Sequence, residues 1–266
     1  MAQSVQTGLV QATQVAQEAL LQQSPNGIHY AAYGDTNITP TDLARMVQAV
    51  PTTIAAALTR KAYFFVPLAM TALNPEDKAE PKSDAKPAEP TMIAAAYHPE
   101  LAENAICHRN VALGEREGVF ISTRLLSDRF ALAFEFFINI GHAFVDAVGV
   151  PSSFTDLVWA QAVADVRGET SQDAWESRAL ALPKASIDAK PPIDEKAKTE
   201  YLESAFSDAV AIYQLSLSVD FDYSELRERE YPLLAPQPLA ERLRMVAKLF
   251  PPNSTYEFAI RYRRRA

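Results

Sequence analysis

The chain has 266 residues, 48% of them apolar, so it is long enough to bury one large core or two small ones. Its net charge of −8 argues against long-range attraction to nucleic acid or to an anionic lipid surface. The single cysteine, Cys107, excludes an internal disulfide and a thiolate-rich metal site. With neither a secretory signal nor the roughly 18 consecutive apolar residues of a membrane span, we expect a soluble, cytoplasmic protein.

The first 73 residues are predicted to form a helical region that packs on the rest of the chain. Apolar side chains recur at helical spacing between residues 4 and 23, which indicates an amphipathic helix. Residues 39–50 begin like a capped helix, with Thr39 or Thr41 as the N-cap, and Pro51 interrupts it. The following run KAYFFVPLAM, residues 61–70, is β-prone and short for a helix.

Two segments are predicted to be loops. Residues 74–90 carry four prolines and alternating charges without one large apolar side chain, so they cannot offset the entropy of ordering and should be flexible. Residues 183–199 have a similar composition and are predicted to form a second exposed excursion that leads into a helix. Residues 91–266 would then form the core of the protein, with the second loop inside it.

The clearest patterns lie between the two loops. Residues 91–98, 104–113 and 118–126 are typical of three short strands. One long helix is predicted over residues 127–149, with Ser127 or Asp128 as its cap and Gly149 at its end. Further helices are predicted at residues 153–168, 198–218 and 236–250, and a last strand at 254–263. The predicted class is α+β and predominantly helical, with a small sheet preceding a long buried central helix.

Five polar side chains share one face of the predicted helix 127–149. At about 100° per residue they fall within an arc of about 60°; they are Asp128, Glu135, Asn139, His142 and Asp146. A buried carboxylate needs water, a hydrogen-bond donor, a cation or a metal, and imidazole with carboxylates suits zinc, iron or manganese. Three interpretations are open: a narrow solvent-facing stripe, a structural polar network, and a metal or catalytic site.

The order of landmarks resembles a family of peptidases. The strand VFISTRLL followed by a long apolar helix resembles the gluzincin metallopeptidases of the HtpX-like and CAAX-prenyl-peptidase superfamily, in which such a strand precedes the H-E-x-x-H helix. Farther along, SAFSDAVA, residues 204–211, resembles the family's E-x-x-A-D-x-x-A helix. DFDYSEL resembles its A-G-Y-D-P turn, and APQPLAERLRMV resembles its H-P-x-x-x-x-R-I segment. The resemblance covers roughly residues 104 to 250 and implies a zincin-like fold.

The sequence departs from this family at the residues that carry its chemistry. Ile138 stands in place of the first histidine and Asn139 in place of the catalytic glutamate, which leaves His142 as the one remaining candidate ligand of the motif. Ser204 occupies the position of the third ligand, with Glu203 beside it, and Asp208 matches a residue that supports the ligands. Isoleucine has no lone pair for a metal, and one histidine cannot replace three protein ligands and a proton-handling glutamate.

The resemblance therefore implies a degenerate, noncatalytic zincin-like protein without a cofactor. Such a protein would bind a peptide or protein partner in the former substrate cleft, where the strand VFISTRLL would still offer a pairing edge. The alternative is a metal-dependent enzyme, a hydrolase or a helical carboxylate site, that uses Glu135, His142 and Asp146 with zinc or another divalent transition metal. A structural subunit is a third possibility. The candidate polar site comprises Glu135, Asn139, His142, Asp146, Glu203 and Asp208.

Overall fold

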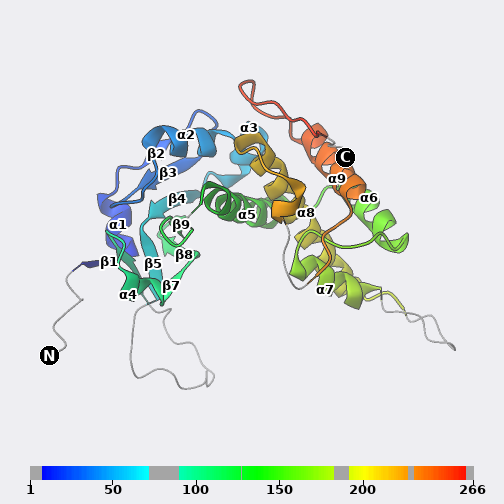
Figure 1. Ribbon diagram of the computed structural model, residues 1–266, viewed down its shortest axis with the longest axis horizontal. Helices are drawn as coiled ribbons and strands as arrows, with labels where there is room; N and C mark the ends of the chain where they lie inside the picture. Colours follow the sequence, from blue (N-terminus) through cyan, green and yellow to red (C-terminus); the bar gives the residue numbers. More distant parts are fainter. Residues whose placement is uncertain (1–7, 72–89, 127, 183–191, 227–230, 262–266) are drawn as a thin grey trace, which may run out of the picture. The chain divides into compact units, whose positions relative to one another are not determined.

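The computed structural model describes residues 8–71, 90–126, 128–182, 192–226 and 231–261 (Figure 1). Contacts divide the chain into two compact units. Unit 1 consists of Met1–Gln48 and Thr59–Glu135, and unit 2 of Ala49–Leu58 and Phe136–Ala266. The predicted α+β, predominantly helical class is confirmed. The predicted flexible loop 74–90 lies outside the described residues except for its last residue.

Unit 1 is built on a five-stranded sheet. Its strands follow the order β2 (Gln22–Gln23), β3 (His29–Ala32), β4 (Lys61–Val66), β9 (Arg116–Ser122) and β8 (His108–Leu113). The three central strands are parallel, and helix α2 (Pro40–Gln48) lies in the connection from β3 to β4. Phe64 of β4 and Phe120 of β9 stack with ring centroids 4.7 Å apart, so the two central strands share one buried aromatic layer.

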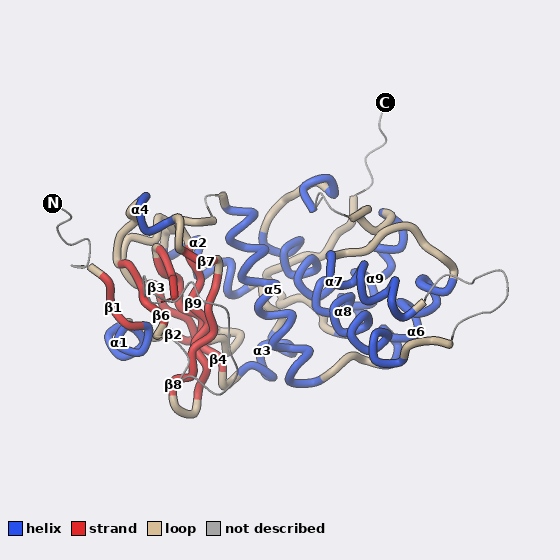
Figure 2. The backbone as a smooth tube through the Cα atoms, turned by 90° about the horizontal axis from the view of Figure 1, so that it is seen from below, coloured by secondary structure: helices blue, strands red, loops and turns tan. Residues whose placement is uncertain are grey.

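A second sheet of unit 1 is wholly antiparallel. Its strands follow the order β1 (Leu9–Gln11), β6 (Thr91–Ala94), β5 (Leu68–Thr71) and β7 (Ala105–Ile106). The short helices α1 (Ala12–Glu18) and α4 (Pro99–Ala102) complete the unit. Two stretches of chain pass from one sheet to the other with a single residue between their strands: Pro67 separates β4 from β5, and Cys107 separates β7 from β8. Figure 2 shows the strands of unit 1 gathered together.

Ser122, at the end of β9, joins the two crossings. Its buried hydroxyl accepts a hydrogen bond from the Ala69 N–H at 2.8 Å and donates one to the Ile106 carbonyl at 2.6 Å. Its own N–H donates to the Cys107 carbonyl at 2.8 Å. A strand that changes sheets leaves backbone groups without their ladder partners, and this one hydroxyl satisfies one group on each crossing strand.

The amino-terminal region differs from the prediction. Of the described residues 8–23, only Ala12–Glu18 is helical, and strands β1 and β2 lie on either side of it. Residues 61–70 form strands, as their composition indicated. Strands that precede residues 74–90 pair with strands that follow them. Strands β1 and β5 both pair with β6, and β4 pairs with β9. The expected separation of a helical region 1–73 from a core 91–266 is therefore wrong, because sheet pairing joins the two.

Unit 2 is helical (Figures 1 and 2). Its elements are α3 (Thr52–Ala55), the 3₁₀ helix η1 (Ala56–Leu58), most of α5 (Arg129–Val148), α6 (Ser152–Val163), α7 (Gln172–Ala181), α8 (Glu195–Ser218), η2 (Tyr223–Leu226) and α9 (Pro236–Leu249). Aromatic rings fill its centre. The ring centroids of Phe154 and Phe206 are 4.8 Å apart, and those of Phe144 and Phe250 are 5.1 Å apart. Helix α8 is buried along most of its second half and is the central element of the unit.

Helix ends agree with the sequence in part. Asp128 caps α5 by accepting the Ala131 N–H at 2.7 Å, whereas Ser127 lies outside the described residues. Helix α8 begins at Glu195 with Asp194 as its N-cap, so the second loop is shorter than predicted; residues 183–191 are not described. Helix α7 was not predicted. Residues 254–261 are not a strand, although they alternate apolar side chains, because no described strand lies beside them to accept their hydrogen bonds.

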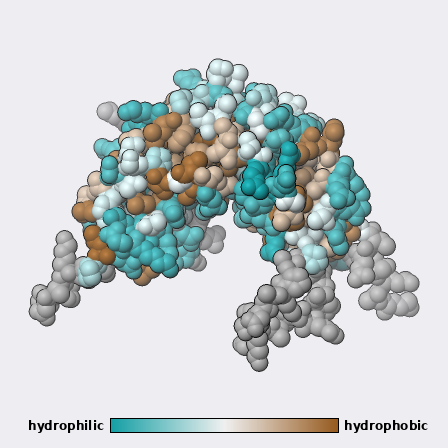
Figure 3. Space-filling model, turned by 180° about the vertical axis from the view of Figure 1, so that it is seen from behind, coloured by the Kyte–Doolittle hydropathy of each residue, from teal (hydrophilic) through white to brown (hydrophobic). Residues whose placement is uncertain are grey.

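Apolar surface is present on the long helix and elsewhere. In the described part of the chain, α5 is the one helix long and apolar enough to cross a membrane, and 56% of its 18-residue apolar window is buried. Burial of this kind is common for a core helix of a globular unit. Val148, Val163 and Leu180 are each more than half exposed, and hydrophobic and hydrophilic residues are interspersed on the face shown in Figure 3.

Candidate functional site

The polar stripe of α5 does not converge on one site. Glu135 belongs to unit 1, where its Oε1 lies 2.5 Å from Nδ1 of His108 on strand β8. Asn139 is buried, whereas His142 and Asp146 in unit 2 are exposed. The helix rises about 1.5 Å per residue, so a stripe from 135 to 146 spans roughly 16 Å and meets different neighbours at its two ends. The proposed ligand set of Glu135, His142 and Asp146 is therefore not assembled.

The surroundings of Glu135 include the single cysteine. Cys107 is exposed as a residue, but its thiol is partly buried, and this burial, followed by the charge of Glu135, raises the pKa of the thiol. A raised pKa favours the protonated thiol, which is a weaker nucleophile than the thiolate. The partnership of His108 with Glu135 was not predicted, because it joins a strand to a helix across 27 positions.

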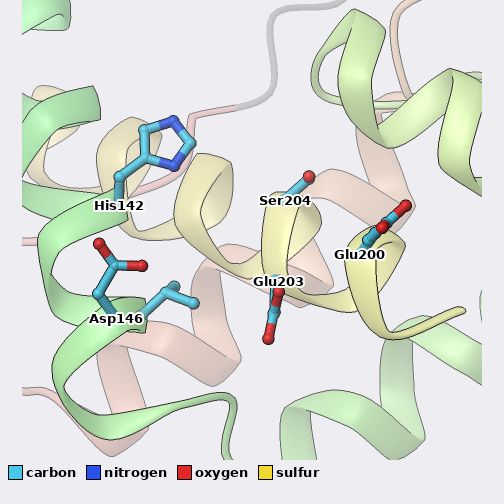
Figure 4. A pocket seen from close by; sticks show the side chains of 6 residues that line it. His142, Asp146, Glu200, Glu203 and Ser204 are labelled. Carbon is cyan, nitrogen blue, oxygen red and sulfur yellow. The ribbon is translucent and has the colours of Figure 1, made fainter. Parts of the chain in front are cut away.

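A pocket of about 180 Å³ does form at the carboxyl half of α5 (Figure 4). His142 and Asp146 project from consecutive turns of α5, and the other polar lining residues, Glu200, Glu203 and Ser204, come from the neighbouring helix α8. The full lining comprises His142, Val145, Asp146, Glu200, Glu203 and Ser204. Spacings of three and four place these side chains on one face of each helix. The structure thus brings together His142, Asp146 and Glu203 of the predicted polar site.

A glycine allows the two helices of this pocket to approach closely. At Gly141 a β-carbon would lie 2.5 Å from the Ser207 carbonyl oxygen of α8 and 3.0 Å from its hydroxyl oxygen. Such a contact is shorter than any side chain tolerates, so only glycine fits at this crossing without displacing the backbone. The glycine that interrupts the apolar run of α5 therefore sets how closely α5 and α8 approach, one residue before His142.

The pocket is acidic. Asp146, Glu200 and Glu203 contribute carboxylates from two helices, and His142 contributes an imidazole. Lys196 lies near the rim, with its Nζ 3.6 Å from Glu200 Oε1, and both side chains are exposed. Among the described residues, no three histidine, cysteine, aspartate or glutamate side chains are grouped closely enough to hold a metal ion. The lining as it stands suits a positively charged group better than a coordinated metal.

A second polar cluster lies inside unit 2, and we call it the Glu169 network. The Glu169 carboxylate is fully buried and pairs with Arg242 of α9 at 2.8 Å and with Arg178 of α7 at 3.0 Å. Tyr201 of α8 donates its hydroxyl to Glu169 Oε1 at 2.7 Å. Arg242 also donates from Nε to the Gln161 side chain of α6 at 2.8 Å. Three helices are therefore tied directly to one carboxylate, and a fourth, α6, is joined to it through Arg242.

Asp208 adjoins this network. It is buried on α8 and accepts a hydrogen bond from the Thr170 hydroxyl at 2.7 Å. Burial raises its pKa from 3.8 to about 6, although the hydroxyls of Ser171 and Thr170 and the charge of Arg242 act to lower it. Asp208 does not line the pocket. The role that the family resemblance implies for it, supporting the residues of the site, is therefore not supported by a position in the pocket wall.

The three charged centres of the Glu169 network were missed from sequence, and one of them left a signal. Arg242 shares the helical face of Leu239, Leu243 and Val246, all buried. A charged residue in phase with a buried apolar stripe indicates a buried ion pair. Glu169 follows Gly168 in a connection without periodicity, so nothing in the sequence marked its burial.

The strand expected to pair with a peptide cannot do so. The run VFISTRLL supplies most of β9, which lies inside the five-stranded sheet between β4 and β8. Both of its hydrogen-bonding edges are occupied, because six registered residue pairs join it to each neighbour. The prediction that this strand is a free edge is wrong, and binding by strand addition there is excluded.

A comparison with protein-family models, with curated proteins and with solved structures finds no match for this chain. The zincin resemblance therefore has no support beyond the ordered motifs of the sequence.

Proposed function

We propose that this protein acts without catalysis, by binding a positively charged segment of a protein partner in the pocket between α5 and α8. The observation that carries the proposal is the lining of this pocket, in which carboxylates of Asp146, Glu200 and Glu203 stand around one opening. A lysine or arginine side chain entering there would gain charge-assisted hydrogen bonds. The net charge of −8 would add a weaker, longer-range attraction.

The residues at the family's catalytic positions support a noncatalytic role. Ile138 cannot bind a metal, and Asn139 at the glutamate position cannot act as a general base at neutral pH. In the zincin interpretation, which also remains a proposal, the pocket keeps a cleft beside the former active-site helix. Recognition would rest on side chains of α5 and α8, since strand β9 has no free edge.

The proposal is tested by charge removal inside and outside the pocket. We would titrate a twelve-residue Lys/Arg-rich peptide, labelled with a fluorophore, into the wild-type protein and follow anisotropy. Asp146→Asn with Glu203→Gln should weaken binding about tenfold or more, because each lost charge-assisted bond is worth on the order of 1 kcal/mol. The matched control, Asp156→Asn with Glu176→Gln, changes the net charge equally at exposed positions of α6 and α7. Equal loss in both double variants would reject the pocket.

A second candidate function is a metal-dependent enzyme, and it is favoured by the fact that His142, Asp146 and Glu203 line one pocket. These side chains would have to move closer together to become ligands, because no three such groups among the described residues are spaced to hold a metal ion. Metal analysis of protein grown with zinc, iron and manganese separates the candidates. One equivalent of metal that is lost in His142→Ala would favour the enzyme, whereas the binding proposal expects no stoichiometric metal.

A further inference from the structure

We propose that Asp208 is a pH-responsive element of unit 2, which takes up a proton on mild acidification and thereby stabilises the folded unit, because the proton removes a buried negative charge from α8. The inference stands on the position of this carboxyl, which is 4% exposed and directed at two hydroxyls of the segment 169–171. It concerns the interior of the unit and is independent of what the pocket binds.

Charged and titratable groups approach Asp208 from several elements. Arg242 comes from α9, Glu169 lies next to Thr170, and Tyr201 shares α8. From α7, Arg178 reaches Glu169 at 3.0 Å, while α6 contributes the uncharged Gln161. On α5, His142 lies across the pocket from Ser204, one turn before Asp208. Two arginines and two carboxylates thus make a buried cluster that is neutral when Asp208 is ionised and positive by one charge when it is protonated.

The two donors of Asp208 are hydroxyls with other functions. Thr170 donates to Asp208 Oδ2, while its carbonyl accepts the Tyr231 hydroxyl at 3.0 Å. The Ser171 hydroxyl also caps α7 by accepting the Ala174 N–H at 3.2 Å. Hydroxyl donors stabilise a carboxylate less than a paired cation does, so burial decides the balance and raises the pKa of Asp208.

The direction of the response follows from linkage. The folded state binds this proton below about pH 6, whereas the unfolded chain binds it only near the ordinary value of 3.8. Between these values the folded state holds more protons, so acidification favours it. The contribution of Asp208 is complete below the unfolded value and is lost as the pH rises through about 6.

The test compares the wild type with Asp208→Asn by chemical denaturation at pH 5 and pH 8. Asparagine keeps the shape and does not titrate, so the difference between the proteins isolates this carboxyl. From pH 8 to pH 5 the unfolding equilibrium constant of the wild type should fall about tenfold relative to the variant, as expected for a group with a folded pKa near 6. Parallel pH dependence in the two proteins would overturn the proposal.

A direct titration covers the case in which the variant does not fold. The carboxyl carbon of Asp208 in isotope-labelled wild-type protein should shift with a midpoint near pH 6, and a midpoint below about 4.5 would overturn the proposal. Thr170→Val removes a donor to the ionised form and should move the midpoint upward. A purely structural hydrogen bond that did not sense ionisation would leave the midpoint unchanged.

Discussion

At the scale of single residues, the interior of unit 2 depends on ionic groups placed among apolar ones. Arg242 is fully buried and contacts Glu169, Gln161 and Tyr201. The Tyr201 hydroxyl remains protonated because burial raises its pKa, so it can act as a donor to Glu169. A network of this kind fixes the relative rotation of its helices, since each bond has one acceptable geometry.

We expect Arg242→Met to destabilise unit 2 by about 3–5 kcal/mol, because it leaves the Glu169 carboxylate buried with one cation fewer. Urea denaturation followed by far-ultraviolet circular dichroism measures the change. Arg244→Met, at an exposed position of the same helix, is the control and should change stability by less than about 1 kcal/mol. Comparable losses of stability in the two variants would contradict a stabilising role for the Glu169 network.

The close contact between Gly141 and Ser207 predicts the sign of the stability change in a Gly141→Ala variant. Glycine-to-alanine substitution in an exposed helix stabilises it by about 1 kcal/mol. In Gly141→Ala the new methyl group would meet the Ser207 backbone, so we expect a loss of about 1–3 kcal/mol instead. Thermal unfolding of the variant decides the question, and a gain in stability would show that the helices are not in contact there.

The candidate site could be predicted from sequence only as far as one helix allows. The angular positions of His142 and Asp146 follow from the helical repeat, and both line the pocket. Glu203 was named through the family resemblance. The same repeat placed Glu135 with them, yet the sequence could not show that His108 would pair with it. Glu200 lies one turn before Glu203 on the facing helix, inside the predicted helix 198–218, and was not recognised because the family motif matched to that helix begins only at Ser204.

At the scale of elements, long periodic helices were predicted and short strands were predicted in part. Helices α5, α6, α8 and α9 lie where their apolar repeats indicated. Strand β3 and helix α7 were missed, because four and ten residues with little pattern take their structure from neighbours. The crossings at Pro67 and Cys107 could not be predicted, since each uninterrupted β-prone run was interpreted as one strand.

These crossings depend on the Ser122 hydroxyl, so Ser122→Ala should destabilise unit 1. The change leaves the Ala69 N–H and the Ile106 carbonyl without the partner they now have, at a cost of about 1–3 kcal/mol. Hydrogen exchange should report the loss first at Ala69, whose amide donates to this hydroxyl. Ser153→Ala, exposed on α6, is the control, and unchanged exchange at Ala69 would contradict this role of Ser122.

At the scale of the whole molecule, the sheets and the candidate pocket belong to different units. Unit 1 contains both sheets, and unit 2 contains the pocket and the Glu169 network. The boundary falls within α5, between Glu135 and Phe136, so one helix supplies residues to each unit. No composition signal marks a boundary inside a continuous helix, which explains why the sequence placed the divisions at the charged loops instead.

The charge of the molecule predicts how partner binding depends on salt. With a net charge of −8 and an acidic pocket, the affinity for a basic peptide should fall by roughly tenfold or more between 50 mM and 500 mM salt, as the screening length shortens from about 14 Å to about 4 Å. Anisotropy titrations across this range measure the slope. Affinity that stays constant with salt would indicate an apolar mode of recognition.

The most direct test of binding without catalysis is to map, by NMR, which backbone amide chemical shifts of the protein change when the basic peptide is added. Mass spectrometry then shows whether the peptide is still intact. We predict shift changes concentrated at residues 141–146 of α5 and 200–204 of α8, and a peptide recovered intact in the presence of zinc or manganese. Shift changes confined to other elements, or a peptide cleaved in a chelator-sensitive way, would contradict the account.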